Sequence, residues 1–407
     1  MKPKHILVVS QLFYPENFRI NDMCCEWVRR GYRVTVLTGI PNYPQGKFYP
    51  GYSWFKKRRE CWNGVEIIRI PLIPRGRRSI GLVLNYLSFV VSGFFWKCFT
   101  RLRPDLVFSF EVSPMTQVLI GTWFSKRRKI PHYLYVQDLW PENVEMITGI
   151  HSPLVIGPIS RMVNYIYRRC HRIFATSPSF VGEIQKRVPG AEDKVAYWPQ
   201  YAEEFYVPLP RQAVPEIPDD GRFKIIFTGN IGQAQGLELL PAAARRLKQT
   251  GCADVTFVIV GDGRHKEKLL EQIQQENVAE MFCMIDHQPA EQIPRLLAAC
   301  DAAFLSFAPD PLFAKTIPAK LQSYMACGMP VLAAACGETQ RLIEESGCGL
   351  CCGIGDEAAL AEGIKSLMGA DLSTMSAKAR AFFEANFRKD RLMDEMDGYF
   401  AAAKIRK

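Results

Sequence analysis

The sequence predicts an α/β protein made of two doubly wound, Rossmann-like domains. Short apolar runs alternate with longer amphipathic segments through both halves of the 407-residue chain, which is the order expected of parallel sheets with helical crossovers. The alternation stops once, at residues 207–218, where four of twelve residues are proline. Because proline-rich stretches of this kind commonly link domains, the interruption predicts an interdomain linker.

Six apolar runs of the N-terminal half are expected to be strands of one sheet. They lie at residues 5–10, 33–38, 65–70, 106–109, 132–136 and 173–176. The first run is too short for the apolar core of a signal peptide, so it is interpreted as a buried strand. Polar side chains follow three of these strands, namely Arg19, Glu111 and Asp138. Because the carboxyl ends of parallel strands meet at one edge of a sheet, these residues are expected to lie along one rim.

The C-terminal half repeats the pattern with strands expected at residues 224–228, 255–260, 281–285, 302–306 and 330–334. A glycine-rich turn, TGNIGQAQGL, follows the first of them and opens a helix. Its glycines let backbone N–H groups approach a ligand, and a helix N-terminus favours an anion. A tight turn alone would explain one or two of its three glycines. The turn therefore predicts a phosphate or sugar site that includes Gly229, Asn230, Gln235 and Gly236.

Three charged residues extend this candidate site. Asp262 and Arg264 follow the next strand in the sequence GDGR, which alone is a common turn. Lys320 lies in the first turn of a predicted helix, where a cation opposes the helix dipole. A nearby anion such as a diphosphate would explain that placement, and a solvated lysine explains it equally well.

Charge is distributed unevenly along the chain. The net charge is +10, but residues 1–205 hold 29 Lys and Arg against 15 Asp and Glu, and the remainder holds 22 against 26. The basic half also contains an apolar run at residues 80–96, which includes Asn85 and Tyr86 and follows Arg75, Arg77 and Arg78. A buried helix and a helix lying in a membrane interface, anchored by these arginines, are both open, whereas the run is short for a span. The distribution favours a lipid surface and a lipid diphosphate over nucleic acid.

Cysteines and acidic residues give no metal pattern. The 13 cysteines include one C-x-x-C at residues 348–351 without a second pair, so reduced thiols of a cytoplasmic protein fit better than zinc or disulfides. No Asp-x-Asp follows an apolar strand. Neither a metal nor a cofactor is therefore expected.

The chain resembles the retaining glycosyltransferases of family 4, which have the GT-B fold. In the C-terminal half the resemblance rests on FTGNIGQAQGLELL, VIVGDGRHKEKL, QIPRLLAACDAAFLS, YMACGMPVLA and GCGLCCGIGDEAALAEGI. In the N-terminal half it rests on VSQLFYPENFRIND, VTVLTGIPNYPQGKFYPGY, IRIPLIPRGRRSIGLVLNYLSF and VQDLWPENVE, which look like bacterial O-antigen and capsule transferases of the L-fucosamine (N-acetylfucosaminyl) type. The resemblance implies an acceptor domain at residues 1–205, a donor domain at 206–387, a final helix at 388–407 that returns to the first domain, and a central cleft that both domains face.

The resemblance also implies a reaction. A hexosyltransferase of this kind moves a sugar, here expected to be an N-acetylated deoxyhexosamine, from a UDP-sugar to an undecaprenyl-diphosphate-linked glycan without a metal. On the acceptor side it points to Asp138, because the histidine that commonly precedes this aspartate is Gln137 here. Glu111 and Arg19, which follow strands of the same half, are the other catalytic candidates, and Arg19 would help to balance the diphosphate. The family commonly has Glu-x7-Glu before its Met-Ala-x-Gly run, but Lys315 and Ser323 occupy those positions here. The donor candidates therefore include Lys315, Lys320 and Ser323, with Glu338 as a substitute carboxylate.

Two other functions stay open from the sequence. A nucleotide-sugar 2-epimerase shares this fold and needs no lipid acceptor. A non-catalytic, membrane-docked scaffold of a polysaccharide complex would explain the missing Glu-x7-Glu. The favoured expectation is a peripheral enzyme on the cytoplasmic face of the inner membrane, in lipopolysaccharide O-antigen, capsule or exopolysaccharide synthesis.

Overall fold

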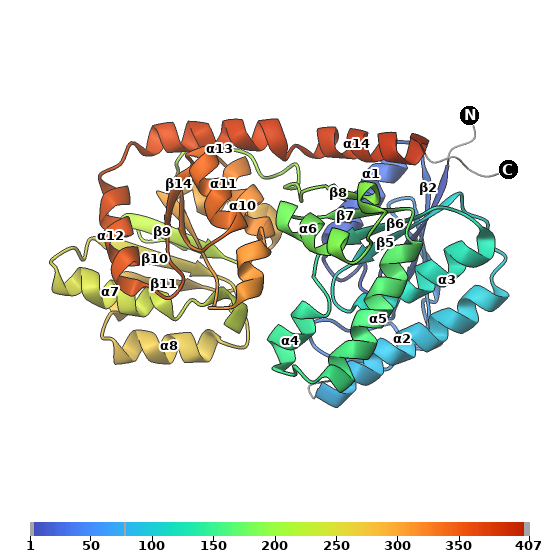
Figure 1. Ribbon diagram of the computed structural model, residues 1–407. Helices are drawn as coiled ribbons and strands as arrows, with labels where there is room; N and C mark the ends of the chain where they lie inside the picture. Colours follow the sequence, from blue (N-terminus) through green and yellow to red (C-terminus); the bar gives the residue numbers. More distant parts are fainter. Residues whose placement is uncertain (1–3, 77–78, 403–407) are drawn as a thin grey trace. The chain divides into compact units, whose positions relative to one another are not determined.

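The computed structural model describes residues 4–76 and 79–402, which form two compact units (Figure 1). Unit 1 extends to Trp198 and resumes at Gly398, and unit 2 comprises Pro199–Asp397. The boundary therefore comes before the proline-rich segment. That segment belongs to unit 2, because Val214 and Ile217 are buried there and Glu216 pairs with Arg295 at 2.7 Å. The prediction that residues 207–218 link the domains is corrected accordingly.

Unit 1 contains an eight-stranded sheet in the order β3-β4-β2-β1-β5-β6-β7-β8. The strands are β1 (His5–Val9), β2 (Arg33–Thr38), β3 (Arg59–Trp62), β4 (Val65–Arg69), β5 (Leu106–Glu111), β6 (His132–Val136), β7 (Arg172–Ala175) and β8 (Val195–Tyr197). All neighbours are parallel except β3 and β4. Since the chain winds outward from β1 in both directions, the strand order reverses between β1 and β5, the place where open parallel sheets bind ligands.

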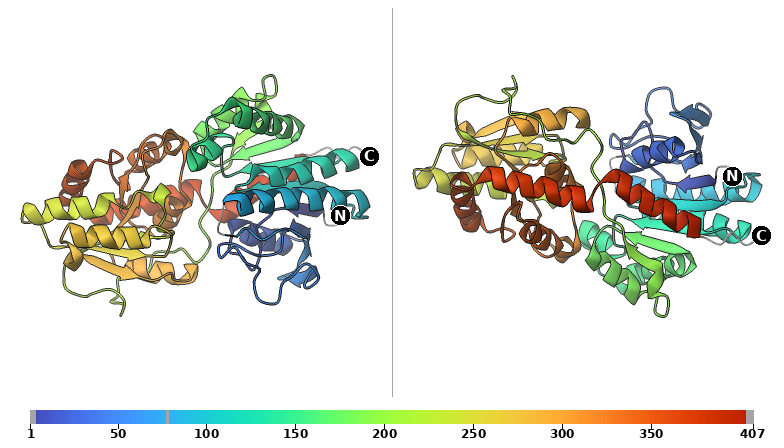
Figure 2. Two further views of the ribbon diagram at one scale, coloured as in Figure 1. Left: turned by 90° about the horizontal axis from the view of Figure 1, so that it is seen from below. Right: turned by 90° about the horizontal axis from the view of Figure 1, so that it is seen from above.

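Helices cover both faces of this sheet. They are α1 (Arg19–Arg29), α2 (Ser79–Phe99), α3 (Val118–Arg128), α4 (Glu142–Thr148), α5 (Pro153–Arg169) and α6 (Pro178–Lys186), with short turns η1 (Met115–Gln117) and η2 (Glu192–Lys194). On one face α3 lies between α2 and α5 (Figure 2). There Leu7, Val9 and Leu37 pack with Phe89 of α2 and Phe124 of α3.

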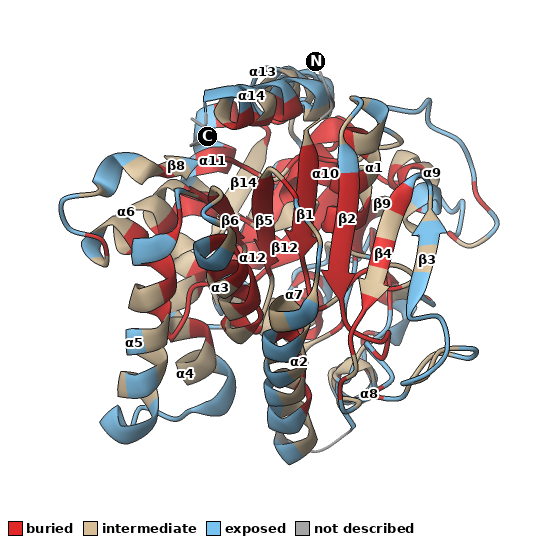
Figure 3. Ribbon diagram, turned by 90° about the vertical axis from the view of Figure 1, so that its right-hand side faces the viewer, coloured by how far each residue is buried: buried red, intermediate tan, exposed pale blue. Residues whose placement is uncertain are grey.

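The apolar run forms helix α2, and most of its surface is not covered. Only 17% of its most apolar window is buried, and by length and composition alone it could cross a membrane. Figure 3 shows the exposed outer face of α2 in pale blue. The exposed apolar side chains recur at helical spacing: Ile80, Val83, Leu84, Leu87, Val91, Phe94, Phe95 and Phe99. The alternative of a helix buried in the domain is therefore wrong, because only a narrow face, which includes Phe89, reaches the core.

Unit 2 contains a six-stranded parallel sheet in the order β11-β10-β9-β12-β13-β14. The strands are β9 (Phe223–Thr228), β10 (Val255–Val260), β11 (Phe282–Ile285), β12 (Ala302–Ser306), β13 (Val331–Ala334) and β14 (Gly349–Cys352). The helices are α7 (Leu239–Gln249), α8 (Lys266–Gln275), α9 (Ile293–Ala298), α10 (Ala319–Ala326), α11 (Glu338–Ser346), α12 (Glu357–Met368), α13 (Leu372–Asn386) and α14 (Lys389–Ala402). The short turns are η3 (Gln233–Gln235), η4 (Ala279–Met281), η5 (Ala290–Gln292) and η6 (Pro311–Lys315). The prediction of two doubly wound sheets is confirmed, and here the order reverses between β9 and β12.

The division between the units falls within α14. Met393 and Met396 are buried in unit 2. Beyond Gly398, the ring of Phe400 lies 5.8 Å from Trp27 and 5.0 Å from Tyr133. Lys4 Nζ also donates to the Phe400 carbonyl at 2.7 Å. The described end of the helix thus completes the core of unit 1, and residues 403–407 of the expected final helix lie outside the described residues.

Candidate functional sites

Two glycine loops meet at the carboxyl edge of the unit 2 sheet. Gly229 N donates to the Val260 carbonyl at 2.9 Å, and Ile231 N donates to the Asp262 carbonyl at 2.8 Å. A Cβ on Gly261 would lie 1.9 Å from the Gly229 carbonyl oxygen, and one on Gly263 would lie 2.2 Å from that of Ile231. The loops after β9 and β10 can approach this closely only because both positions lack a side chain.

Lys320 lies beside this pair of loops. Its Nζ is 3.9 Å from the ring centroid of Phe227 and would be 3.4 Å from a Cβ on Gly229. Tyr324, one turn later, accepts a hydrogen bond from Thr228 N at 3.0 Å and so holds α10 against β9. Burial lowers the pKa of Lys320 to about 7, and the amine forms no ion pair with any residue that the structure describes. An unpaired cation at an open glycine loop suits an anionic ligand.

The other donor candidates of this edge lie on the same two loops. Gln235 Oε1 accepts from Gly232 N at 3.2 Å, which shapes the first loop. Gly236 has a φ of +55°, and a Cβ there would lie 2.8 Å from the Phe307 carbonyl. Asn230 and Arg264 are exposed, and Asp262 Oδ1 accepts from Gly263 N at 2.8 Å within its own turn. The structure therefore gathers these residues with Lys320 at one edge.

The positions that replace Glu-x7-Glu lie close by in the fold. Ser323 is buried, and its hydroxyl donates to the Ala319 carbonyl at 3.4 Å within α10. Glu338 begins α11 and accepts from Arg341 at 2.9 Å. Lys315 ends η6, and Thr339 Oγ1 ties the start of α11 to the end of η6 by donating to the Thr316 carbonyl at 2.8 Å. Because the Ser323 hydroxyl is used inside its own helix, Glu338 is the better candidate for the missing carboxylate.

In unit 1, Asp138 stands two residues beyond β6 and is held from one side. Its Oδ2 accepts from Ser113 N at 2.8 Å and from Ser113 Oγ at 2.7 Å. Asn143 Nδ2 donates to the same Ser113 hydroxyl at 2.7 Å. Burial raises the pKa of Asp138, and the Ser113 hydrogen bonds oppose that shift. Its second oxygen, Oδ1, accepts no hydrogen bond from a described residue, so it is available to a ligand hydroxyl.

Glu111 lies behind Asp138. Its side chain is 0% exposed, and Oε2 accepts from Asp138 N at 3.3 Å. Oε1 has no hydrogen-bond partner within the described chain. Burial, and then the nearby Asp138 charge, hold the pKa of Glu111 well above its usual range. Because its side chain is fully buried, Glu111 lies under the Asp138 loop and supports the backbone there, and its catalytic role stays a prediction.

Two further polar residues of this rim, Glu16 and Arg19, follow β1. Glu16 is buried and accepts from the backbone N–H groups of Asn42 and Tyr43, both at 2.7 Å. Burial raises the pKa of Glu16 to about 7, against the effect of these hydrogen bonds. Burial raises the pKa of the Tyr135 phenol well above its usual range, and the charge of Arg19, at the start of α1, opposes that shift. Glu16 thereby joins the loop after β1 to the loop after β2.

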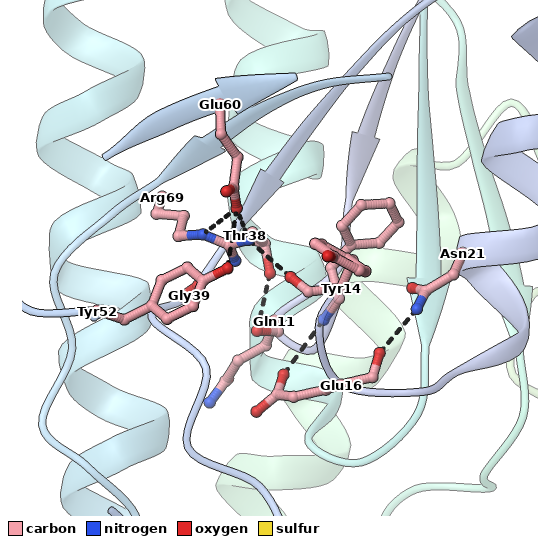
Figure 4. A network of polar contacts seen from close by, with 10 residues as sticks. Gln11, Tyr14, Glu16, Asn21, Thr38, Gly39, Tyr52, Glu60 and Arg69 are labelled. Carbon is pink, nitrogen blue, oxygen red and sulfur yellow. Dashed lines mark hydrogen bonds and ion pairs between the residues drawn. The ribbon is translucent and has the colours of Figure 1, made fainter. Parts of the chain in front are cut away.

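A buried arginine supports the same two loops (Figure 4). Arg69 of β4 is 1% exposed, and its guanidinium donates to the carbonyls of Tyr14 at 2.6 Å and Gly39 at 3.3 Å. It also pairs with Glu60 of β3. The side chain of Arg69 thus links the loop after β1 to the loop after β2. No sequence pattern indicated this role.

The predicted membrane residues divide into two groups. Asn85 is buried, accepts from Gln11 Nε2 at 2.7 Å and donates to the Ile73 carbonyl at 2.6 Å, so it anchors α2 rather than facing a surface. Arg75 and Tyr86 are partly exposed. Arg77 and Arg78 lie outside the described residues.

Both halves of the chain match known families of glycosyl transferase domains. Residues 17–200 match the glycosyl transferase 4-like domain, and residues 211–386 match the glycosyl transferases group 1 family. The probable glycosyltransferase WbjE of Pseudomonas aeruginosa is 26% identical over 261 residues, which cover 62% of this chain and 64% of that protein. This chain thus spans just under two thirds of the length of that relative.

Two further proteins resemble more of the chain. The putative colanic acid biosynthesis glycosyl transferase WcaI of Escherichia coli is 27% identical over 321 residues, 74% of this chain and 75% of that protein. The solved structure of HepE from Anabaena, in complex with UDP and glucose, has a TM-score of 0.67 at 17% identity and covers 98% of this chain and 100% of that chain. At that identity the likeness shows the fold. The chain belongs to the glycosyltransferases of the GT-B fold, with a glycosyl transferase 4-like domain followed by a group 1 domain.

Proposed function

We propose that this glycosyltransferase moves a sugar from a UDP-sugar to a lipid-linked glycan, with retention of configuration, in the synthesis of O-antigen, capsule or exopolysaccharide. The unpaired Lys320 amine beside the glycine loops of unit 2 carries the proposal, because a departing nucleoside diphosphate needs such a cation. The HepE complex with UDP and the colanic acid relative support the ligand and the pathway class. The sugar we favour is an N-acetylated deoxyhexosamine.

The donor half of the reaction is electrostatic. As the bond between the sugar C1 and the diphosphate oxygen breaks, negative charge grows on the diphosphate. Lys320, whose amine lies beside the loop at Gly229, would stabilise that charge. Lys315 at the end of η6 and Glu338 at the start of α11 would contact the diphosphate and the ribose.

The acceptor half uses Asp138. Its Oδ1 would accept a hydrogen bond from the acceptor hydroxyl, while Ser113 holds Oδ2 in place. The hydroxyl loses its proton to this carboxylate or to the departing diphosphate, and its oxygen forms the new bond to C1. The products are the extended glycan and UDP.

Membrane association completes the proposal. The exposed apolar face of α2 lies in a unit with a large basic excess, a combination that suits the surface of an anionic bilayer. The enzyme would then be peripheral on the cytoplasmic face of the inner membrane, where its glycolipid acceptor is anchored.

A calorimetric titration tests the donor site. UDP is expected to bind the wild type, and Lys320→Gln should weaken UDP binding roughly 10-fold to 100-fold, because a charge-assisted contact is lost. Lys248→Gln is the matched control, since Lys248 is exposed and pairs with Glu280 on another part of unit 2. If UDP does not bind the wild type, the scaffold function is favoured instead.

Analysis of the reaction products distinguishes a glycosyltransferase from a nucleotide-sugar 2-epimerase. Incubation with UDP-sugars and lipid-linked acceptors, read by mass spectrometry, should give a glycosylated lipid that Asp138→Asn does not form at a comparable rate. Conversion of the UDP-sugar to an epimer without any acceptor would contradict the transferase proposal and favour a 2-epimerase.

A further inference from the structure

Two loops of unit 1 are joined into one wall near the carboxyl edge of its sheet. Arg75 N donates to Asn42 Oδ1 at 3.0 Å, and Gly76 N donates to the Gly46 carbonyl at 3.0 Å. Gly46 has a φ of +73°, and a Cβ there would lie 2.5 Å from the Gly76 carbonyl oxygen. The loops after β2 and β4 therefore meet in a fixed geometry that requires glycine at position 46.

The beginning of α2 closes on this wall. A Cβ on Gly81 would lie 2.6 Å from the Arg75 carbonyl oxygen. Asn85 Nδ2 donates to the Ile73 carbonyl at 2.6 Å and to Asn42 Oδ1 at 3.4 Å. The first two turns of α2 thus hold both loops, and Tyr86 follows the anchoring Asn85.

Three side chains project from these three segments. The Arg75 guanidinium lies 5.4 Å from the centroid of the Tyr43 ring, and Tyr43 is 36% exposed. The guanidinium forms no ion pair or hydrogen bond with a described residue. Burial raises the pKa of the Tyr86 phenol, the Arg75 charge lowers it, and the Asp138 charge raises it. An unpaired cation and two tyrosines therefore share one region with Asp138.

We infer that Tyr43, Arg75 and Tyr86 form the acceptor subsite for the diphosphate of a polyprenyl-diphosphate glycan. The inference rests on the proposed function and specifies its acceptor. A planar guanidinium can donate two parallel hydrogen bonds to phosphate oxygens. The tyrosine rings offer flat apolar faces with polar edges, which suit the sugar attached to that phosphate. Asp138 would meet the reacting hydroxyl of the glycan.

Because the subsite lies beside α2, the lipid chain of the acceptor would lie close to the apolar face of that helix. The exposed apolar face of the helix starts at Ile80 and continues through Val83 and Leu84, which precede Tyr86 by less than one helical turn. A lipid chain leaving a diphosphate bound at Arg75 would lie along this face or enter the bilayer beside it. Arg75 therefore acts on the substrate, and not as the general membrane anchor that the basic cluster suggested.

Farnesyl diphosphate, a short polyprenyl diphosphate, provides the probe. It is titrated into the full-length protein in the presence of saturating UDP, so that the diphosphate site of unit 2 is occupied. The wild type should bind it, and Arg75→Gln should bind it about tenfold more weakly or worse. Arg75→Lys should fall between the two, because an ammonium keeps the charge but not the paired donors. Farnesol, which lacks the diphosphate, should bind weakly to every form.

Arg101→Gln is the matched control. Arg101 is exposed just beyond the other end of α2 and has no ion pair within the described residues, so its removal changes the charge equally. Farnesyl diphosphate binding that survives in Arg75→Gln, or that falls equally in Arg101→Gln, would overturn the inference. Equal binding of farnesol would overturn it as well, since only the chain would then be recognised.

A separate UDP titration distinguishes failure of the subsite from failure of the proposed function. Arg75→Gln should bind UDP as the wild type does. Tyr43→Ala, which leaves the Arg75 backbone contacts in place, should also weaken farnesyl diphosphate binding. Unchanged binding in Tyr43→Ala would remove the aromatic part of the subsite.

Discussion

The amine of Lys320, a partly buried residue, is expected to change its protonation when a ligand binds. Burial over Phe227 lowers the pKa of its amine to about 7, and no carboxylate of the residues that the structure describes is in contact to oppose the shift. A bound diphosphate would supply the missing negative charge and raise that pKa again. Ligand binding and proton uptake at Lys320 are therefore expected to be coupled.

The coupling predicts a pH dependence. UDP affinity should fall as the pH rises through and above about 7, because the free enzyme then holds Lys320 in its neutral form. Calorimetry in buffers of different ionisation enthalpy should detect proton uptake at pH 8. Lys320→Arg should remove the dependence, since arginine stays charged, and an unchanged pH profile in that variant would contradict the assignment.

Glu111 allows a second prediction for a single residue. Because burial and then the Asp138 charge raise the pKa of this carboxyl and so favour its neutral form, Glu111→Gln should retain folding and most of the transfer rate. Glu111→Ala should lose about 1–3 kcal/mol of stability, since the Asp138 N–H loses its acceptor. Differential scanning calorimetry together with transfer rates would test both variants. A loss of activity in Glu111→Gln as large as that in Asp138→Asn would instead show that Glu111 ionises during turnover.

The secondary-structure elements show which parts of the fold the sequence could reveal. The buried parallel strands are near-continuous apolar runs, so they and their carboxyl ends were predictable. Strands β3, β8 and β14 were not, because they are short edge strands with mixed sequences such as RECW and GLCC. The apolar run of α2 gave the helix but not its exposure, since periodicity alone does not show which neighbours cover it.

The candidate site was predictable to a similar extent. Asp138 was singled out by its position after a strand end, and Lys320 by its place in the first turn of a helix, although a solvated lysine explained that place equally well. The arrangement of Asn42, Arg75 and Asn85 was not predictable, because it depends on three loop and helix segments that are distant in the sequence and meet through hydrogen bonds of the Asn42 and Asn85 side chains. Arg69 was missed for the same reason.

The exposed face of α2 leads to a prediction for this element. Leu87→Ser and Val91→Ser should weaken binding to vesicles that contain phosphatidylglycerol while leaving the melting temperature nearly unchanged, because both side chains are exposed. Phe89→Ser on the buried face should instead lower the melting temperature by the mechanism of core disruption. Vesicle cosedimentation and thermal melting provide the two measurements. Unaltered vesicle binding in Leu87→Ser and Val91→Ser would exclude α2 as the contact.

At the scale of the whole molecule, the division into units sharpens the charge asymmetry. Unit 1 contains 32 Lys and Arg against 13 Asp and Glu, whereas unit 2 contains 19 against 28. The unit that we propose binds the nucleotide is thus acidic overall and must hold its anion with a few placed cations and amides. The basic excess belongs to the unit with the exposed apolar helix.

This asymmetry predicts different salt responses for the two ligands. Raising the salt from about 0.05 M to about 0.5 M should strongly reduce binding to anionic vesicles, because surface charges are screened beyond about 10 Å at 0.1 M. UDP binding should change much less, since Lys320 is largely desolvated beside Phe227. Vesicle cosedimentation and UDP calorimetry across the same salt series test this, and a parallel loss of both would contradict it.

The contacts of Phe400 set an order of events during synthesis. Phe400 belongs to unit 1 but is translated after all of unit 2, and it fills a space beside Trp27, Phe108 and Tyr133. During translation the core of unit 1 therefore stays incomplete until Phe400 has been synthesised, whereas unit 2 can finish folding earlier. A stop codon just before Gly398 should accordingly yield an intact unit 2 attached to an aggregation-prone unit 1.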